Sequence, residues 1–296
     1  MAVSVLAESQ DVTFAEQARH LLALAKPRLS SLVVFTAATG FALAPGESSL
    51  WVGLITTVAT TLLVASANAF NCYLEREQDA RMRRTEDRPF ATGKVSVRLA
   101  LGIYGSLAAL AVPSLAYVAN PLTALFGAIA FVTYVWIYTP LKYRSTTALF
   151  VGAIPGAAPP LMGYTAATGH ADAVGWLLFA VLFVWQLPHF LAISIYLRDD
   201  YERGGMKVFS IVHGFDTTRT AIVVTSILLV GVGLLTVPLG VMSLTWGLVG
   251  ALPGLALTWL SLRGFVSKGG DLWARKVFLA TLLYLPIFLS IWAIGS

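Results

Sequence analysis

A block of charged side chains follows directly on an apolar segment near residue 70. Asn71, Glu75 and Asp79 recur every four residues, so they share one face if the helix continues past the apolar segment. Oxygen-bearing side chains in such a column suit a hard divalent cation, because Mg²⁺ is commonly held by one or two carboxylates together with substrate phosphates. The spacing therefore predicts a Mg²⁺ site at these three residues.

Basic side chains surround this column of oxygen atoms. They are Arg76, Arg81, Arg83, Arg84 and Arg88. Guanidinium groups pair readily with phosphate oxygens, so these side chains are expected to face the anionic part of a substrate. Acidic groups for a metal and basic groups for an anion alternate directly after an apolar segment. This pattern predicts a lipid-like diphosphate as substrate.

The elements that must position these residues are membrane helices. The chain has 296 residues, of which 57% are hydrophobic and 12% are charged, well outside the range of soluble globular proteins. Because a membrane-spanning helix needs roughly twenty apolar residues, we predict an all-α polytopic protein with nine transmembrane helices. Their expected bounds are 29–45, 50–70, 99–119, 121–140, 146–166, 174–197, 220–239, 242–262 and 277–295.

The distribution of positive charge gives the orientation of these helices. All 20 Lys and Arg residues precede the first span or lie between spans two and three, four and five, six and seven, or eight and nine. Since cytoplasmic loops carry the excess of Lys and Arg, we expect the N-terminus inside, the C-terminus outside and the active site on the cytoplasmic face of the cell inner membrane. The net charge of +5 follows from this orientation, so the chain has no need of a nucleic-acid partner.

Two domains are expected, a short N-terminal segment over residues 1–28 and a nine-helix domain over residues 29–296. Thr13 and Glu16 have the spacing of a capping box, which predicts a short interfacial helix in the first segment. Lys26 precedes the first span and suits a topology anchor as well as a substrate contact. The single cysteine, Cys72, excludes an internal disulfide.

Spans four to six carry further candidate groups. Lys142 and Arg144 follow span four; Pro140 is expected to disfavour helical geometry at Thr139 and so to place both cations on an inside loop. Span five is rich in Gly, Ala and Pro, which suits either close helix packing or a curved wall beside a bulky ligand. His189 lies inside span six; an intramembrane histidine is a functional candidate, although a hydrogen bond to a neighbouring helix would also explain it.

A second charged block follows span six. It runs from Tyr196 to Lys207 and contains Asp199 and Asp200. Tyr196-Leu197 before this block repeats Tyr73-Leu74 in the first block, and four spans separate the two. Because an even number of spans preserves direction, we predict a parallel internal repeat of four helices whose two charged blocks converge on one substrate.

These motifs together resemble the UbiA-type intramembrane prenyltransferases. The matching elements are Asn71-xxx-Glu75-xxx-Asp79, Met82-x-Arg84-Thr85-x-x-Arg88-Pro89, Tyr138-Thr139-Pro140-Leu141-Lys142, Gly156-Ala157-Ala158-Pro159-Pro160-x-x-Gly163-Tyr164, Trp185-Gln186-x-Pro188-His189-Phe190 and Asp200-Tyr201. The Trp-Gln-x-Pro-His and Gly-Ala-Ala-Pro-Pro elements are similar to the branch of that family that modifies heme. Two departures stand out: Glu75 replaces the usual aspartate, and the second block lacks a paired Asp-xxx-Asp spacing.

The resemblance implies a reaction and roles for particular residues. The implied reaction transfers the farnesyl group of farnesyl diphosphate to a vinyl group of heme b, with addition of water, to give heme O, with Mg²⁺ as cofactor. The lipid bilayer, heme A synthase and oxidase assembly factors are the further expected partners. The expected catalytic residues are Asn71, Glu75, Asp79, Lys142 and Asp200. The expected substrate-binding residues are Arg83, Arg84, Arg88, Arg144, Asp199 and His189.

Two alternatives stay open. A UbiA-type enzyme could act on another acceptor, such as a quinone-precursor aromatic or a chlorin. The stretch from Trp185 to His189 distinguishes the two cases, because binding an aromatic acid gives no evident reason for these residues. A non-catalytic heme carrier or transporter is the alternative from another class. A permeation path is ordinarily marked by polar residues through the membrane, whereas the charges here gather on one side.

Overall fold

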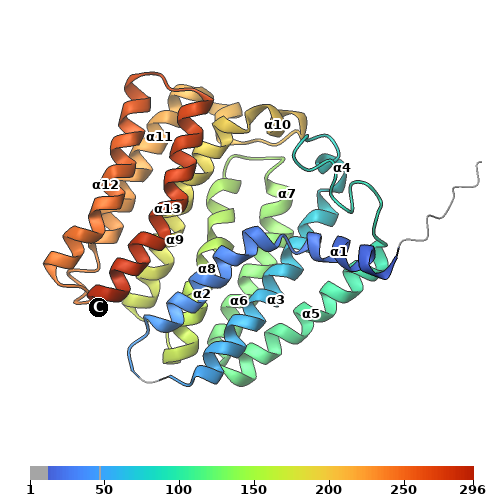
Figure 1. Cartoon of the computed structure of the whole chain (residues 1–296), viewed down its shortest axis with the longest axis horizontal. Helices are drawn as coiled ribbons and strands as arrows, with labels where there is room; N and C mark the ends of the chain where they lie inside the picture. Colours follow the sequence, from blue (N-terminus) through green and yellow to red (C-terminus); the bar gives the residue numbers. More distant parts are fainter. Residues whose placement is uncertain (1–12, 47) are drawn as a thin grey trace, which may run out of the picture.

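The computed structural model describes residues 13–46 and 48–296, and these residues fold into a bundle of helices (Figure 1). The first half contains α1 (Phe14–Leu24), α2 (Pro27–Ala42), α3 (Leu50–Leu74), α4 (Arg76–Asp79), α5 (Val97–Val118), α6 (Pro121–Val132), the π-helix η1 (Thr133–Tyr138), α7 (Thr139–Leu141) and α8 (Ala148–Thr168). The second half contains α9 (Ala173–Tyr196), α10 (Arg198–Arg203), α11 (Phe209–Leu234), α12 (Leu244–Val266) and α13 (Asp271–Gly295).

Each of the nine predicted spans overlaps a helical segment of this bundle. Within the described residues, seven helices are long and apolar enough to cross a membrane: α3, α5, the continuous stretch Pro121–Leu141, α9, α11, α12 and α13. The first predicted span contributes a shorter apolar helix, Ser30–Ala42. The fifth, α8, is not among the seven, and its glycines and three internal prolines dilute its hydropathy. The multi-pass character is thus confirmed, and the count of nine crossings stays a prediction.

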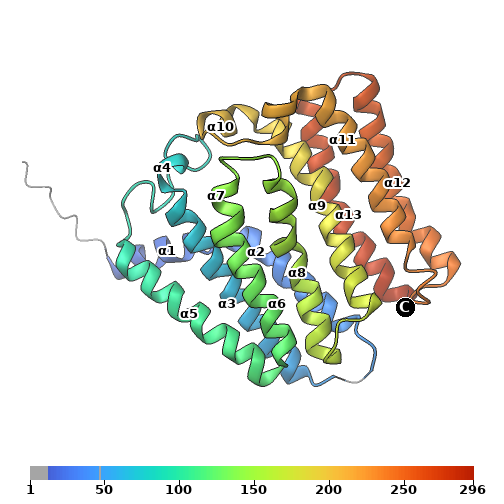
Figure 2. The ribbon, with the colours of Figure 1, turned by 180° about the vertical axis from the view of Figure 1, so that it is seen from behind.

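The two charged blocks meet at one end of the bundle. α3 is followed by the short helix α4, and α9 is followed by the short helix α10. Figures 1 and 2 show α4 and α10 on the same side of the molecule, while the C-terminus lies at the opposite end. Two segments that are more than 110 residues apart in the sequence are therefore neighbours in space.

Glycines bring α2 and α8 into close contact. A Cβ atom on Gly163 would lie 1.9 Å from the carbonyl oxygen of Ala37, and one on Gly40 would lie 2.0 Å from that of Pro160. The small residues of α8 thus allow close helix packing, as one of the two interpretations of this segment predicted. Pro155 and other residues of α8 also line a cavity, so the other interpretation, a curved wall beside a bulky ligand, stays a prediction.

The prediction that Pro140 disfavours helical geometry at Thr139 was wrong. Thr139 has helical dihedral angles and begins α7, directly after η1. The wider π-helical turn places the Thr139 hydroxyl 2.8 Å from the Tyr134 carbonyl oxygen, five residues earlier. Such π-helical insertions are frequent at functional sites because they re-aim side chains.

The N-terminal capping box is confirmed. The Glu16 backbone N–H donates to the Thr13 hydroxyl, and the Thr13 N–H donates to the Glu16 carboxylate at 3.0 Å. α1 exposes Phe14 and Leu22 and buries Leu24. An interfacial position of this helix remains a prediction, and residues 1–12 of the predicted N-terminal segment lie outside the described residues.

We expect Gly163→Ala to destabilise the protein by about 1–3 kcal/mol, because the added methyl group meets backbone atoms of α2 rather than a movable side chain. The measurement is the melting temperature in detergent, with the fraction of folded protein at each temperature determined by size-exclusion chromatography. Gly102→Ala is the matched control, since a Cβ atom at Gly102 meets nothing within 4 Å. Equal melting temperatures for the two variants would contradict the close contact between α2 and α8.

Candidate active site

The predicted column of oxygen-bearing side chains forms where α3 ends. Glu75 interrupts the helix (φ −98°, ψ 4°), yet its N–H donates to the Asn71 carbonyl oxygen at 3.0 Å and its own carbonyl accepts from the Asp79 N–H at 2.7 Å. The helical repeat therefore continues through the interruption into α4. Asn71, Glu75 and Asp79 are only 1%, 3% and 1% exposed, so the column faces the interior.

Asn71 is held by groups on two other segments. Its amide nitrogen donates to the Thr139 hydroxyl at 3.0 Å, and its amide oxygen accepts from the Lys26 ammonium at 2.7 Å. Lys26 precedes α2 with a left-handed backbone (φ 50°), a conformation that is uncommon for a residue with a side chain. Of the two roles weighed for Lys26, the structure supports a place in the site.

Glu75 forms an ion pair with Lys142, in the loop after α7, and accepts a hydrogen bond from the Tyr143 hydroxyl at 3.0 Å. Burial alone would raise the pKa of Glu75, but the Lys142 and Lys26 ammonium groups and these hydrogen bonds hold the pKa below its usual value. Burial alone would likewise lower the pKa of Lys142, and the Glu75 carboxylate raises it instead. Both side chains are thus charged at neutral pH.

Asp79 is bound by Arg88, which lies in the connection between α4 and α5. One guanidinium nitrogen of Arg88 contacts both carboxylate oxygens, at 2.8 and 2.7 Å. The Thr85 hydroxyl also donates to the Asp79 carbonyl oxygen at 3.0 Å, which folds the connection back onto α4. Each member of the column therefore has its own cationic partner.

The buried cluster has one more positive than negative charge. Its cations are Lys26, Lys142 and Arg88, whereas only Glu75 and Asp79 are anionic. Buried charges are stable only when they are compensated. The surplus charge is that of Lys26, whose hydrogen-bond partner is a neutral amide. Burial lowers the pKa of Lys26, so an anion in the site would stabilise its charged form. The cluster therefore predicts that the site receives an anion.

The donor atoms of the column fit a hard metal ion, since all are amide or carboxylate oxygens. Within residues 13–46 and 48–296, however, the structure has no group of three or more His, Cys, Asp or Glu residues arranged to hold a metal. The column itself offers two carboxylates and one amide, each engaged by a cation. Mg²⁺ therefore fits these residues only if the three cations release them, which an arriving diphosphate would favour.

Asp200 joins the second charged block to the first. Its carboxylate accepts hydrogen bonds from the backbone N–H groups of Arg83 and Arg84, both at 3.2 Å, and pairs with Arg203. Burial alone would raise the pKa of Asp200, but the bonds from Arg203 and these two N–H groups hold it below its usual value. The two blocks are thus in contact, through Asp200 and the backbone of the first block rather than its acids, and their convergence on one substrate stays a prediction.

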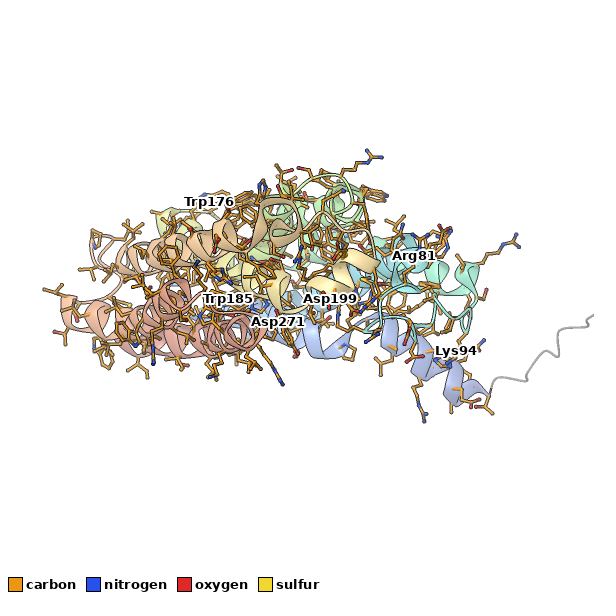
Figure 3. The ribbon with its side chains drawn as sticks, turned by 90° about the horizontal axis from the view of Figure 1, so that it is seen from above. Arg81, Lys94, Trp176, Trp185, Asp199 and Asp271 are labelled. Carbon is orange, nitrogen blue, oxygen red and sulfur yellow. The ribbon has the colours of Figure 1, made fainter. Side chains whose placement is uncertain are left out.

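Four of the predicted substrate-binding side chains lie on the surface. They are Arg83, Arg84, Arg144 and Asp199. Figure 3, seen from the end of the bundle that carries α4 and α10, labels Asp199 and Arg81 on this face. Only Arg88 and His189 of the predicted substrate-binding residues lie inside the protein.

An apolar cavity of about 290 Å³ lies inside the bundle close to the charged cluster, although none of the cluster's charged residues lines it. Its lining includes Asn68, one helical turn before Asn71, and Tyr134 and Tyr138 of η1. The Tyr138 ring also contacts the cluster, because its centroid lies 4.8 Å from the Lys142 ammonium. The site thus combines a cationic end with an apolar interior.

His189 lines the same cavity from α9. Its Nδ1 lies 2.8 Å from the Thr281 hydroxyl of α13, and its ring stacks on Trp185 with centroids 5.1 Å apart. The Trp185 indole N–H donates to the Thr281 carbonyl oxygen at 2.7 Å. Both interpretations of His189 hold in part: it has a hydrogen bond to a neighbouring helix, and it faces a cavity.

Sequence reasoning missed Thr139, Tyr143 and Thr281. Thr139 lies in the quoted Tyr-Thr-Pro-Leu-Lys element and Tyr143 directly after it, but only Lys142 was selected there. No pattern in the sequence distinguishes Thr281 from other hydroxyl residues of the last span, because its role depends on the packing of α13 against α9.

The sequence pattern of the UbiA prenyltransferase family matches residues 33–294. The chain belongs to this family. A protoheme IX farnesyltransferase from Anaeromyxobacter sp. (strain Fw109-5) is 56% identical over 281 residues, which cover 95% of both chains. The mitochondrial protoheme IX farnesyltransferase of Homo sapiens is 39% identical over 272 residues, covering 91% of this chain and 60% of the human protein.

Solved structures share the fold at low sequence identity. A digeranylgeranylglyceryl phosphate synthase superimposes with a TM-score of 0.79 and 15% identity, covering 95% of this chain and 98% of the other. A UbiA homolog from Archaeoglobus fulgidus, bound to DMAPP and Mg²⁺, gives a TM-score of 0.71 at 16% identity, covering 93% and 99%. These likenesses establish the arrangement of helices.

We expect Asp200→Ala to loosen the connection between α4 and α5, because two backbone N–H groups lose a charged acceptor worth about 1.5–3 kcal/mol per bond. Trypsin cleavage after Arg81, Arg83 and Arg84 of the folded protein should accelerate about tenfold or more. Asp199→Ala is the control, since that neighbouring carboxylate is exposed. Equal cleavage rates for the two variants would show that Asp200 does not hold this connection.

Proposed function

We propose that the protein transfers the farnesyl group of farnesyl diphosphate to a vinyl group of heme b, with addition of water, and so makes heme O for terminal oxidase biogenesis. The acceptor and donor are those of the relatives, since the 56% identical bacterial protein and the human protein are both protoheme IX farnesyltransferases. Alignment over 95% of both chains supports the same activity here.

The observation that carries this proposal is the union of a cationic cluster with an apolar cavity. Lys26, Lys142 and Arg88 present a surplus positive charge to an anion. The cavity of about 290 Å³ is lined mainly by apolar side chains and shares Tyr138 with the surroundings of Lys142. A diphosphate with a long hydrocarbon chain has the matching two-part chemistry.

The chemistry starts with cleavage of the allylic C–O bond, whose electron pair leaves with the diphosphate. Lys26, Lys142 and Arg88 stabilise the negative charge that develops on this leaving group; one such electrostatic contact is typically worth about 3–4 kcal/mol of barrier. Mg²⁺, held by Asn71, Glu75 and Asp79 when bound, would supply further charge neutralisation. The Mg²⁺ found with DMAPP in the Archaeoglobus fulgidus structure supports this metal.

The farnesyl cation then meets the acceptor inside the cavity. The vinyl π electrons form the new C–C bond, and the cation left on the adjacent vinyl carbon takes up water and loses a proton. The apolar walls keep bulk water away from the first cation. His189 and Trp185 line the cavity and are suited to contact the flat macrocycle.

We also propose nine spans, with the N-terminus inside, the C-terminus outside, and the site at the cytoplasmic face of the cell inner membrane. The positions of Lys and Arg support this orientation. A four-helix parallel repeat is supported by the order of elements, because a long helix is followed by a short charged helix twice, at α3–α4 and α9–α10. Heme A synthase and oxidase assembly factors are the proposed partners downstream.

The test of this function uses purified protein in detergent with heme b, farnesyl diphosphate and Mg²⁺. Mass spectrometry should detect a heme that has gained one farnesyl group and one hydroxyl group, and a chelator should abolish this product. Bound heme without product, across several prenyl chain lengths, would favour a heme carrier. Product from a quinone-precursor aromatic or a chlorin, with none from heme, would favour another acceptor.

Asp79→Asn should lower turnover at least about 100-fold, because it removes a buried negative charge that holds Arg88 and is proposed to hold the metal. Turnover is measured in the same assay, and folding by size-exclusion chromatography. Glu77→Gln is the matched control, since the Glu77 side chain is 70% exposed and pairs only with Arg76 at the surface. Full activity of Asp79→Asn would refute the assignment of this carboxylate.

A further inference from the structure

Thr281 has a single hydroxyl proton, and the structure shows where it points. Its Oγ1 lies 2.6 Å from the carbonyl oxygen of Phe278. Two oxygen atoms at this separation need a proton between them, and a backbone carbonyl has none to give. The Thr281 hydroxyl therefore donates to Phe278, and its oxygen can only accept from other groups.

This constraint fixes the tautomer of His189. The His189 Nδ1 lies 2.8 Å from the Thr281 Oγ1, so Nδ1 must carry the proton and donate it. A neutral imidazole has only one N–H. Nε2 of His189 consequently keeps a free lone pair.

The surroundings keep the ring neutral and fixed in place. Among the described residues its hydrogen-bond and ring contacts are Thr281, Trp185, Phe190 and Phe278, none of which carries a charge. Trp185 is itself held by the Thr281 carbonyl oxygen, so one residue of α13 orients both stacked rings of α9. His189 lines the apolar cavity, and among the described residues no hydrogen bond engages its Nε2.

We propose that His189 binds the iron of the tetrapyrrole acceptor through Nε2, and that Thr281 is the positioning residue that prepares it. Neutral imidazole is a common axial ligand of heme iron. A hydrogen bond from the other ring nitrogen fixes the tautomer and raises the basicity of the ligating nitrogen. This inference rests on the proposed function, because it names how that function's acceptor is held.

The cavity explains what such a ligand achieves. Its lining includes His189 from α9 as well as Asn68 and Tyr134, which lie next to the charged cluster. A macrocycle attached to Nε2 would therefore lie in the cavity next to the proposed diphosphate site. The axial bond would leave it rotation about one axis, so that a vinyl edge could be turned toward the prenyl donor.

In the test, purified protein in detergent is titrated with ferric heme and, separately, with metal-free protoporphyrin IX. Binding is monitored by Soret absorbance and resonance Raman spectroscopy. His189→Ala should lose the histidine-ligated heme spectrum and bind heme about tenfold more weakly or worse, while its affinity for metal-free protoporphyrin IX stays unchanged. Added imidazole should restore the spectrum of His189→Gly.

Thr281 variants separate positioning from packing. Thr281→Val should weaken heme binding about tenfold and leave metal-free protoporphyrin IX binding intact, and Thr281→Ser should restore the wild-type spectrum. Thr258→Val is the matched control, since Thr258 is a buried threonine of α12 whose hydroxyl bonds only its own helix, at Gly254. A wild-type spectrum in Thr281→Val would overturn the role of Thr281.

Two further outcomes separate this inference from the function on which it rests. Equal losses of heme and metal-free porphyrin binding in His189→Ala would overturn iron ligation, while porphyrin binding by the wild type would leave the proposed function standing. If the wild type binds neither porphyrin but still binds farnesyl diphosphate, both the ligation and the heme acceptor are wrong.

Discussion

The buried carboxylates of Glu75 and Asp79 impose the constraint on which the site depends. A charge removed from water must be compensated by a partner, or its burial destabilises the fold by several kcal/mol. Lys142 and Arg88 supply these partners, and Lys26 binds the neighbouring amide of Asn71. Because the three cations come from segments far apart in the sequence, forming the cluster fixes those segments around the end of α3.

The second half of the chain closes the site without entering the cluster. Asp200 binds backbone N–H groups of the first charged block, so α10 holds the connection that carries Arg88. α9 and α13 contribute the opposite wall of the cavity, where Thr281 orients Trp185 and His189. Ion pairs thus define the polar end of the site, and hydrogen bonds between helices define its apolar end.

The sequence was sufficient for features that follow from local periodicity. The spacing of Asn71, Glu75 and Asp79 predicted a column on one helical face because helical geometry determines which residues share a face, and hydropathy located the helices. Contacts between distant segments could not be predicted in this way. Thr281 looks like any hydroxyl in an apolar span, and Asp200 binds the backbone of Arg83 and Arg84, whose own side chains point to solvent. The π-helical turn before Pro140 likewise overrides the local preference that predicted non-helical geometry there.

The ion pairs of the cluster also bear on how a diphosphate and a metal would enter together. A metal ion alone would have to displace Lys26, Lys142 and Arg88 from the oxygens that they hold, leaving three cations without partners. A diphosphate alone would bring further negative charge beside Glu75 and Asp79. If the two arrived together, the cations could turn to the phosphate oxygens while the carboxylates held the metal, so every charge would keep a partner. The exchange would rearrange ion pairs within a cluster that is already assembled, so the cations would lie beside the leaving group before its negative charge develops, as electrostatic stabilisation requires.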